Sequence, residues 1–363
     1  MKITSYKTRM ITLPTDVGEH RMGTTEFPVN YVTLQVQTDE GIEGISYAGV
    51  IKDPYVPALK MVIDTMLDQA VAQGLDPFDG DALLALKDDV GSGSPAGLIT
   101  RSHSAIDVAC WDLRGKALGK PVRHLLGSTK DRVPTYATGR LWRHHDLKTL
   151  AEIAPKIVEQ GFTEVKVPLG GQATVADEVA RYQVVKEAVG PDVRVSVDIN
   201  QGWTVNQAIT IGRKLEELGL FWLEDPVHFQ DIDGMARIAD ALDVPICGGE
   251  YVYGLRPFLH MFERHAVDIV MVDIFRAGGI TGFMQVAQVA NAFGIPMVSH
   301  LSTEFLSQAL SAVPLLQTVD HVNWTFPLFQ EVPQVENGEL ILMSGPGFGM
   351  AFDEDALEHF SVG

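Results

Sequence analysis

Three carboxylates, Asp198, Glu224 and Glu250, directly follow three successive apolar segments in the middle of the chain. The segments are residues 193–197, 220–223 and 244–249. Successive carboxylates are 26 residues apart, which is enough for one helix and the return to the next parallel strand. A single acid after a strand is usually a helix cap or a solvated loop residue. Three acids in phase form an all-oxygen cluster and favour a hard cation such as Mg²⁺.

Other residues with the chemistry of proton transfer follow neighbouring segments. His300 can take up and release a proton near neutral pH, and Asp273, which follows the preceding apolar segment, could orient its ring and favour the imidazolium form. A lone histidine after a strand is more often structural, but the pair indicates a general acid/base. Lys166 could contact a substrate carboxylate or act as a base. The alternative is that Lys166 is a salt-bridged lysine inside the fold.

The elements that must position these residues alternate between strand and helix from residue 133 onward. About eight repeats favour a closed barrel, an α/β fold, over an open doubly wound sheet, and no glycine-rich phosphate-binding sequence opens a helix. In a barrel the strand ends face the active site, so the candidate residues would gather at one mouth. The predicted strands are 133–137, 164–167, 193–197, 220–223, 244–246, 268–272, 296–298 and 319–323. The predicted helices are 147–160, 175–189, 205–218, 233–242, 257–265, 282–293 and 304–313.

The residues before the barrel have a different pattern. Residues 1 to about 50 alternate like an antiparallel meander, and 56–72, 79–90 and 102–118 are helical, which predicts an α+β domain. After about residue 327, a turn at 337–338 between short apolar runs predicts a tail that contains a hairpin. We expect the segments 14–28 and 49–55 to cover the barrel mouth and to determine specificity. Their candidate substrate contacts, which could equally face solvent, are His20, Arg21 and Lys52.

Composition limits the partners of the chain. The net charge of −19 argues against nucleic acid or an anionic membrane as a partner. No apolar run approaches the 18 or so residues of a membrane helix, and the N-terminus does not have the pattern of a signal peptide, so a cytoplasmic location is expected. Cys110 and Cys247 lie within apolar stretches, which predicts buried thiols.

Motifs along nearly the whole chain resemble the enolase superfamily, and specifically its mandelate racemase subgroup. The matching segments are 101–113 with 115–119, 197–201, 222–226, 249–250, 273 with 278–282, and 299–300. The resemblance implies a modified (β/α)₇β barrel (126–326) beneath a capping domain. It implies that the cap is built from residues 1–125 and a returning C-terminal tail (327–363). It also implies one essential Mg²⁺ per subunit and a small carboxylate substrate, and we expect a homo-oligomer.

The resemblance assigns roles to the candidate residues. It implies that the metal ligands are Asp198, Glu224 and Glu250 and that Asp273 and His300 form a His–Asp dyad. The family often has a glutamate near the last barrel strand that hydrogen-bonds the enediolate, and Asp320 is the nearest acid at that place. Two further residues are candidates for contact with the substrate or the metal shell: Asn200, and Tyr136 at the end of the first barrel strand.

One departure from the family pattern bears on the reaction. The subgroup commonly ends its second barrel strand with Lys-x-Lys, whereas this chain has Lys166, Val167 and Pro168. Proline cannot ionise, so the base opposite His300 is missing and a two-base racemase or epimerase is disfavoured. The prediction is therefore Mg²⁺-dependent dehydration of an acid sugar, an aldonate or aldarate, to a 2-keto-3-deoxy acid. The alternatives are a cycloisomerase or lactonising enzyme that uses the same enediolate, and a non-catalytic barrel.

Overall fold

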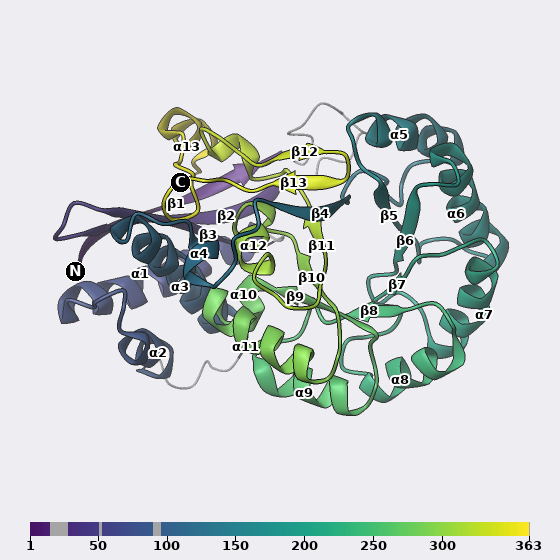
Figure 1. Ribbon diagram of the computed structural model, residues 1–363, viewed down its shortest axis with the longest axis horizontal. Coiled ribbons are helices and arrows are strands. Elements are labelled where there is room, and N and C mark those ends of the chain that lie inside the picture. The colour runs from purple at the N-terminus through teal and green to yellow at the C-terminus, as the bar shows by residue number, and fades with distance from the viewer. Residues whose placement is uncertain (15–27, 51–52, 90–95, 363) are drawn as a thin grey trace.

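The computed structural model describes residues 1–14, 28–50, 53–89 and 96–362. Its N-terminal part is an antiparallel sheet in the order β1-β2-β3, packed against helices (Figure 1). The strands are β1 (Ile3–Leu13), β2 (Val29–Thr38) and β3 (Glu43–Val50). The helices are η1 (Asp53–Tyr55), α1 (Val56–Gln73), α2 (Gly80–Asp89), α3 (Leu98–Ala117) and α4 (Val122–Leu125). Over the described ranges, no helix is long and apolar enough to cross a membrane.

The second part is a ring of eight parallel strands surrounded by helices (Figure 1). The strands run in the order β4 to β11, and β11 pairs with β4, so the predicted closed barrel is confirmed and the open doubly wound sheet is excluded. The strands are β4 (Arg132–Ala137), β5 (Glu164–Pro168), β6 (Arg194–Asp198), β7 (Leu223–Glu224), β8 (Ile246–Gly248), β9 (Ile269–Asp273), β10 (Met297–His300) and β11 (Leu316–His321). The helices are α5 (Leu147–Glu159), α6 (Val175–Val189), α7 (Val205–Glu216), α8 (Ile232–Ala241), α9 (Leu255–Glu263), α10 (Ile274–Ala277), α11 (Gly279–Ala292) and α12 (Thr303–Leu310).

Two barrel strands are shorter and later than their apolar segments predict. β8 begins at Ile246 instead of Val244, because Pro245 has no N–H to donate and the Ile246 N–H donates to the Asp268 carboxylate. β7 is only two residues long, although the Phe221 N–H still bonds to a carbonyl of β6. Short strands leave the residues after them free to turn toward the barrel axis.

The C-terminal tail folds back on the cap. The hairpin of β12 (Gln334–Glu336) and β13 (Glu339–Ile341) has the predicted turn, with left-handed φ values of 52° and 78° at 337 and 338, and it pairs with β4. A short helix that the sequence pattern does not predict, α13 (Glu354–Phe360), then leads to a bridge between Ser361 and Ile11 of β1. η3 (Phe326–Leu328) links β11 to this tail. The domain boundaries at 125/126 and 326/327 stay a prediction.

Asp112 of α3 joins three parts of the cap. Its fully buried carboxylate accepts hydrogen bonds from the N–H groups of Ile45 and Phe348, at 3.0 and 2.9 Å, and from Lys116 Nζ at 2.6 Å. We expect Asp112→Ala to lower the free energy of unfolding by about 3 kcal/mol, because two buried N–H groups and a lysine lose their acceptor. Urea denaturation would measure the change. The control is Asp240→Ala on exposed α8, expected to stay within about 0.5 kcal/mol, and equal losses would contradict this role.

Candidate active site

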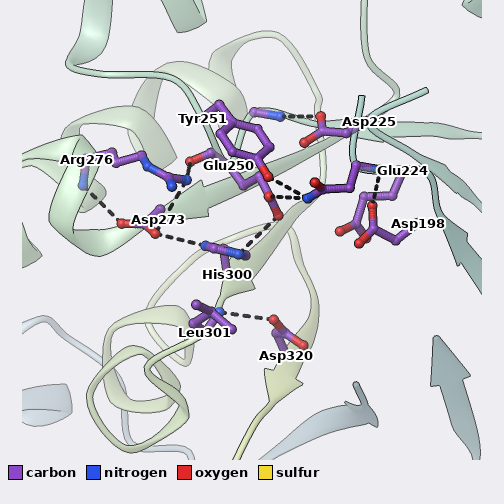
Figure 2. Close-up of polar contacts among 12 residues, drawn as sticks. Asp198, Glu224, Asp225, Glu250, Tyr251, Asp273, Arg276, His300, Leu301 and Asp320 are labelled. Carbon is purple, nitrogen blue, oxygen red and sulfur yellow. Dashed lines mark hydrogen bonds and ion pairs between the residues drawn. The ribbon is translucent and has the colours of Figure 1, made fainter. Parts of the chain in front are cut away.

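The carboxyl ends of the barrel strands bring the three predicted metal ligands together. Asp198 ends β6, Glu224 ends β7, and Glu250 lies two residues beyond β8. Asp198 and Glu224 are direct neighbours in the β6–β7 register. Figure 2 shows their side chains close together, with Glu250 between them and His300. Glu224 and Glu250 are buried, so this corner of the mouth concentrates negative charge away from water.

That concentration of charge controls the protonation of the cluster. Burial raises the pKa of Glu224 well above its usual range; Lys166 opposes the rise, and the charges of Asp198 and Glu250 add to it. Burial and the charge of Glu250 likewise raise the pKa of Asp198, against the effect of Lys166. The cluster therefore needs a cation in order to remain ionised.

Lys166 supplies one positive charge to this cluster. It lies on β5, is buried, and donates from Nζ to Glu224 Oε1 at 2.6 Å. Burial alone would lower the pKa of Lys166, but the surrounding carboxylates outweigh it and raise that pKa well above its ordinary value. Lys166 is therefore held protonated, which suits a role in stabilising negative charge and not a role as a base.

The donor chemistry of Asp198, Glu224 and Glu250 fits Mg²⁺, since all donors are carboxylate oxygens on adjacent strands. Among the residues that the structure describes, no three His, Cys, Asp or Glu side chains already have the spacing of a metal-ligand set. Glu224 instead accepts from Lys166, and Glu250 Oε2 lies 3.1 Å from His300 Nε2. The assignment of the three ligands stays a prediction.

The structure brings the predicted dyad together at the ends of β9 and β10. His300 and Asp273 are register partners, and His300 Nδ1 lies 2.8 Å from Asp273 Oδ2. Burial alone would raise the pKa of Asp273, but Arg276 and the hydrogen bond from His300 hold it below its ordinary value. Burial alone would lower the pKa of His300, but Glu250 and Asp273 raise it. Because Nδ1 is engaged by Asp273, Nε2 is the nitrogen directed at the carboxylate cluster (Figure 2).

Sequence reasoning missed two residues that connect the dyad to the carboxylates. Arg276 lies 3.7 Å from Asp273 and donates to the backbone carbonyl of Glu250. Its guanidinium also lies 4.7 Å from the ring centre of Tyr251, whose hydroxyl accepts a hydrogen bond from Asn200. The only available signal for Arg276 was its position three residues after Asp273, which caps the N-terminus of α10.

Asn200, a predicted substrate or metal-shell residue, lies beside Glu250. Its Nδ2 is 3.5 Å from Glu250 Oε1, and its backbone N–H donates to Asp198 Oδ1 at 2.7 Å. Asn200 has a left-handed φ of 49°, which turns the chain sharply after β6. These contacts place Asn200 next to the predicted metal ligands.

Asp320 and Tyr136 lie deeper than expected. Asp320 is buried, and its Oδ2 accepts from the N–H of Leu301 at 3.0 Å, so it anchors the turn directly after His300. Tyr136 is fully buried inside the barrel against Trp222, with Lys166 Nζ 5.5 Å from its ring centre. This differs from the expected substrate contact, because the inward-pointing side chain lies beneath Lys166 and not at the mouth. His20, Arg21 and Lys52 lie outside the described residues.

A hollow lies between the cap and the barrel beside His300; we call it the cap–barrel hollow. Its volume is about 580 Å³ with its open mouth included. The cap contributes Tyr31 and Arg101 to its wall, and the barrel contributes His300, Leu301 and Trp324. It is large enough for a small organic acid.

A closed eight-stranded barrel with a separate cap and a carboxylate cluster at its mouth defines the enolase-like class of α/β proteins. The family described as "Enolase C-terminal domain-like" matches residues 149–356 of the chain. The family described as "Mandelate racemase / muconate lactonizing enzyme, N-terminal domain" matches residues 4–127. The chain belongs to the enolase superfamily and to its mandelate racemase subgroup, as the sequence motifs predict.

Relatives of known activity catalyse different reactions. The L-talarate/galactarate dehydratase of Salmonella typhimurium is 30% identical over 90% of this chain and 82% of its own length. The D-galactarolactone cycloisomerase of Agrobacterium fabrum is 27% identical over 100% of this chain and 99% of its own length. The crystal structure of L-talarate dehydratase from Polaromonas sp. JS666, complexed with Mg and L-glucarate, superimposes with a TM-score of 0.91. It is 26% identical and covers 100% of this chain and 98% of that chain.

Proposed function

We propose that this protein is a Mg²⁺-dependent hydro-lyase that dehydrates an acid sugar, an aldonate or aldarate, to a 2-keto-3-deoxy acid. The ligands would be Asp198, Glu224 and Glu250. Bound Mg²⁺ would stabilise the negative charge that develops on the substrate carboxylate when the α-proton leaves. The donor set described above and the Mg-containing structure of the Polaromonas dehydratase support this assignment.

The residues of the chain divide the chemistry between them. His300 Nε2 takes the α-proton, while Asp273 holds Nδ1 and stabilises the imidazolium that forms. The protonated Lys166 stabilises the enediolate. His300 then returns its proton to the leaving 3-hydroxyl, so that water departs and the remaining enol tautomerises to the 2-keto acid. One group thus serves both proton transfers.

The observation that carries this proposal is the position of the bases. His300 faces the carboxylate cluster from the ends of β9 and β10, with Asp273 behind it. Across the cluster, β5 ends at Pro168, the register partner of Asp198. Lys166 on the same strand is held protonated by its neighbours and cannot accept a proton. A single base favours elimination over inversion of the α-carbon.

Deuterium exchange tests the one-base mechanism. A substrate analogue without a leaving group at C3 should exchange its α-hydrogen in D₂O only in the configuration that points at His300, and with retention. The reason is that the face opposite His300 has Pro168 in place of a base. Proton NMR and chiral chromatography of the recovered acid would measure exchange and configuration. Deuterium incorporation with inversion would reveal a second base and refute the mechanism.

A cycloisomerase is the second candidate, because the Agrobacterium cycloisomerase matches the full length of the chain. It would form the same enediolate without loss of water. Mass spectrometry of the product separates the two reactions, since dehydration lowers the mass by one water and cycloisomerisation leaves it unchanged. A product of unchanged mass would favour this second candidate.

A further inference from the structure

The cap–barrel hollow determines where the far end of a substrate can lie. Its wall includes His300 and Asp273 but none of the three predicted metal ligands. A substrate whose carboxylate faces Glu224 and whose α-proton faces His300 Nε2 must therefore extend its remaining carbons past His300 into this hollow. The chemistry of its wall bears on the end of the substrate farthest from the carboxylate.

Most of that wall is apolar. Trp324 forms one side and is held by Trp142, whose ring stacks on it at 5.9 Å between centres. Tyr31 of β2 packs edge-on against Tyr47 at 5.2 Å on the cap side. The apolar side chains of the wall are Val29, Tyr31, Phe275, Leu301, Val322 and Trp324.

The cations in the described part of the wall already have partners. Arg101 donates to the Gly49 carbonyl and to the Tyr253 hydroxyl. Arg276 is engaged by the Glu250 carbonyl and by Asp273, and His300 is engaged by Asp273 and Glu250. A second carboxylate on the substrate would lose its hydration here and find none of these cations uncommitted. Its negative charge would also lie near Asp273.

From this geometry we infer that the substrate is a monocarboxylate whose far end is apolar: a deoxy sugar acid that ends in a methyl group, and not an aldarate. This inference rests on the proposed function and narrows it to one substrate class. The terminal methyl group would lie among Tyr31, Val322 and Trp324. A terminal hydroxyl in the same place would be desolvated without a hydrogen-bond partner.

A matched series of six-carbon acids tests the inference. Each set shares its configuration at C2 to C5 and differs only at C6, as methyl, hydroxymethyl or carboxylate. The purified protein with Mg²⁺ is assayed for the 2-keto-3-deoxy product across all configurations. In the configuration that is turned over, kcat/KM should be about ten- to hundredfold higher for the methyl acid than for the hydroxymethyl acid. The carboxylate-ended acid should be the poorest substrate.

Val322→Thr provides an independent measurement on the same series, because it adds a hydroxyl to the wall with little change in volume. It should narrow the preference for methyl over hydroxymethyl by about two- to tenfold. The matched control is Val335→Thr on β12, whose hairpin pairs with the start of β4 and so lies at the opposite end of the barrel. The control should leave the preference unchanged.

The outcomes separate the two proposals. A preference for the hydroxymethyl or carboxylate acid, with a 2-keto-3-deoxy product, overturns the inference and leaves the proposed reaction standing. An unchanged preference in Val322→Thr also overturns the placement of the methyl group. If no acid of any configuration loses water or exchanges its α-proton in D₂O, the proposed function itself fails and the inference fails with it.

Discussion

Replacing His300 by asparagine is expected to lower kcat by about 10³-fold or more, because both proton transfers of the proposed reaction use His300 Nε2. Asparagine keeps a polar group near Asp273 but cannot accept the α-proton. Steady-state assays of product formation would measure the loss. Circular dichroism and calorimetric titration with Mg²⁺ should show unchanged folding and metal affinity, which separates a chemical defect from a structural one.

The matched control is His260→Asn on the exposed surface of α9, which should retain full activity. Near-native kcat in His300→Asn would identify another group as the base and reject the mechanism. Loss of Mg²⁺ affinity in the same variant would instead assign His300 to the metal site.

Asp273→Asn tests the second member of the dyad. Asp273 both orients the His300 ring and raises its pKa. We expect a loss of about 10²-fold or more in kcat/KM. The residual activity should also have a changed pH profile. A base acts only when deprotonated, so kcat/KM rises with pH through the pKa of His300, and removal of the carboxylate lowers that pKa and moves the rise to lower pH. An unmoved profile would contradict the pairing.

The sequence predicted the parts of the site that follow from strand order. Asp198, Glu224, Asp273 and His300 each end a barrel strand, and the carboxyl ends of parallel strands always share one mouth. Counting segments was therefore enough to bring them together. The closed barrel followed from the same count, since eight strand–helix repeats complete a ring.

The depth and the loop contacts of the site could not be predicted in this way. Tyr136 ends its strand region just as Asp198 does, but it is fully buried inside the barrel beneath Lys166. Side chains alternate along a strand, and the pattern alone does not say which inward layer is the top one. Arg276 was missed because its contacts depend on α10, a single turn that begins where Asp273 caps it. Such a turn is too short to give helical periodicity.

Replacing Glu224 by glutamine is expected to abolish Mg²⁺ binding and to lower kcat by about 10³-fold or more. The substitution removes one of three carboxylates from the cluster and neutralises the partner of Lys166. Charge stabilisation by a bound metal contributes several kcal/mol, and each 1.4 kcal/mol is a factor of ten in rate. Chelation of the unmodified protein should have the same effect, and added Mg²⁺ should restore activity to the unmodified protein only.

Calorimetric titration gives the readout that activity alone cannot. Glu358→Gln on the exposed face of α13 removes one negative charge far from the barrel mouth and should bind Mg²⁺ like the unmodified protein. Full activity of Glu224→Gln without bound metal would refute the ligand assignment. If Glu224→Gln instead binds Mg²⁺ normally but is inactive, Glu224 acts through Lys166, because burial would then favour the neutral amine of Lys166 once the carboxylate that holds its proton is gone.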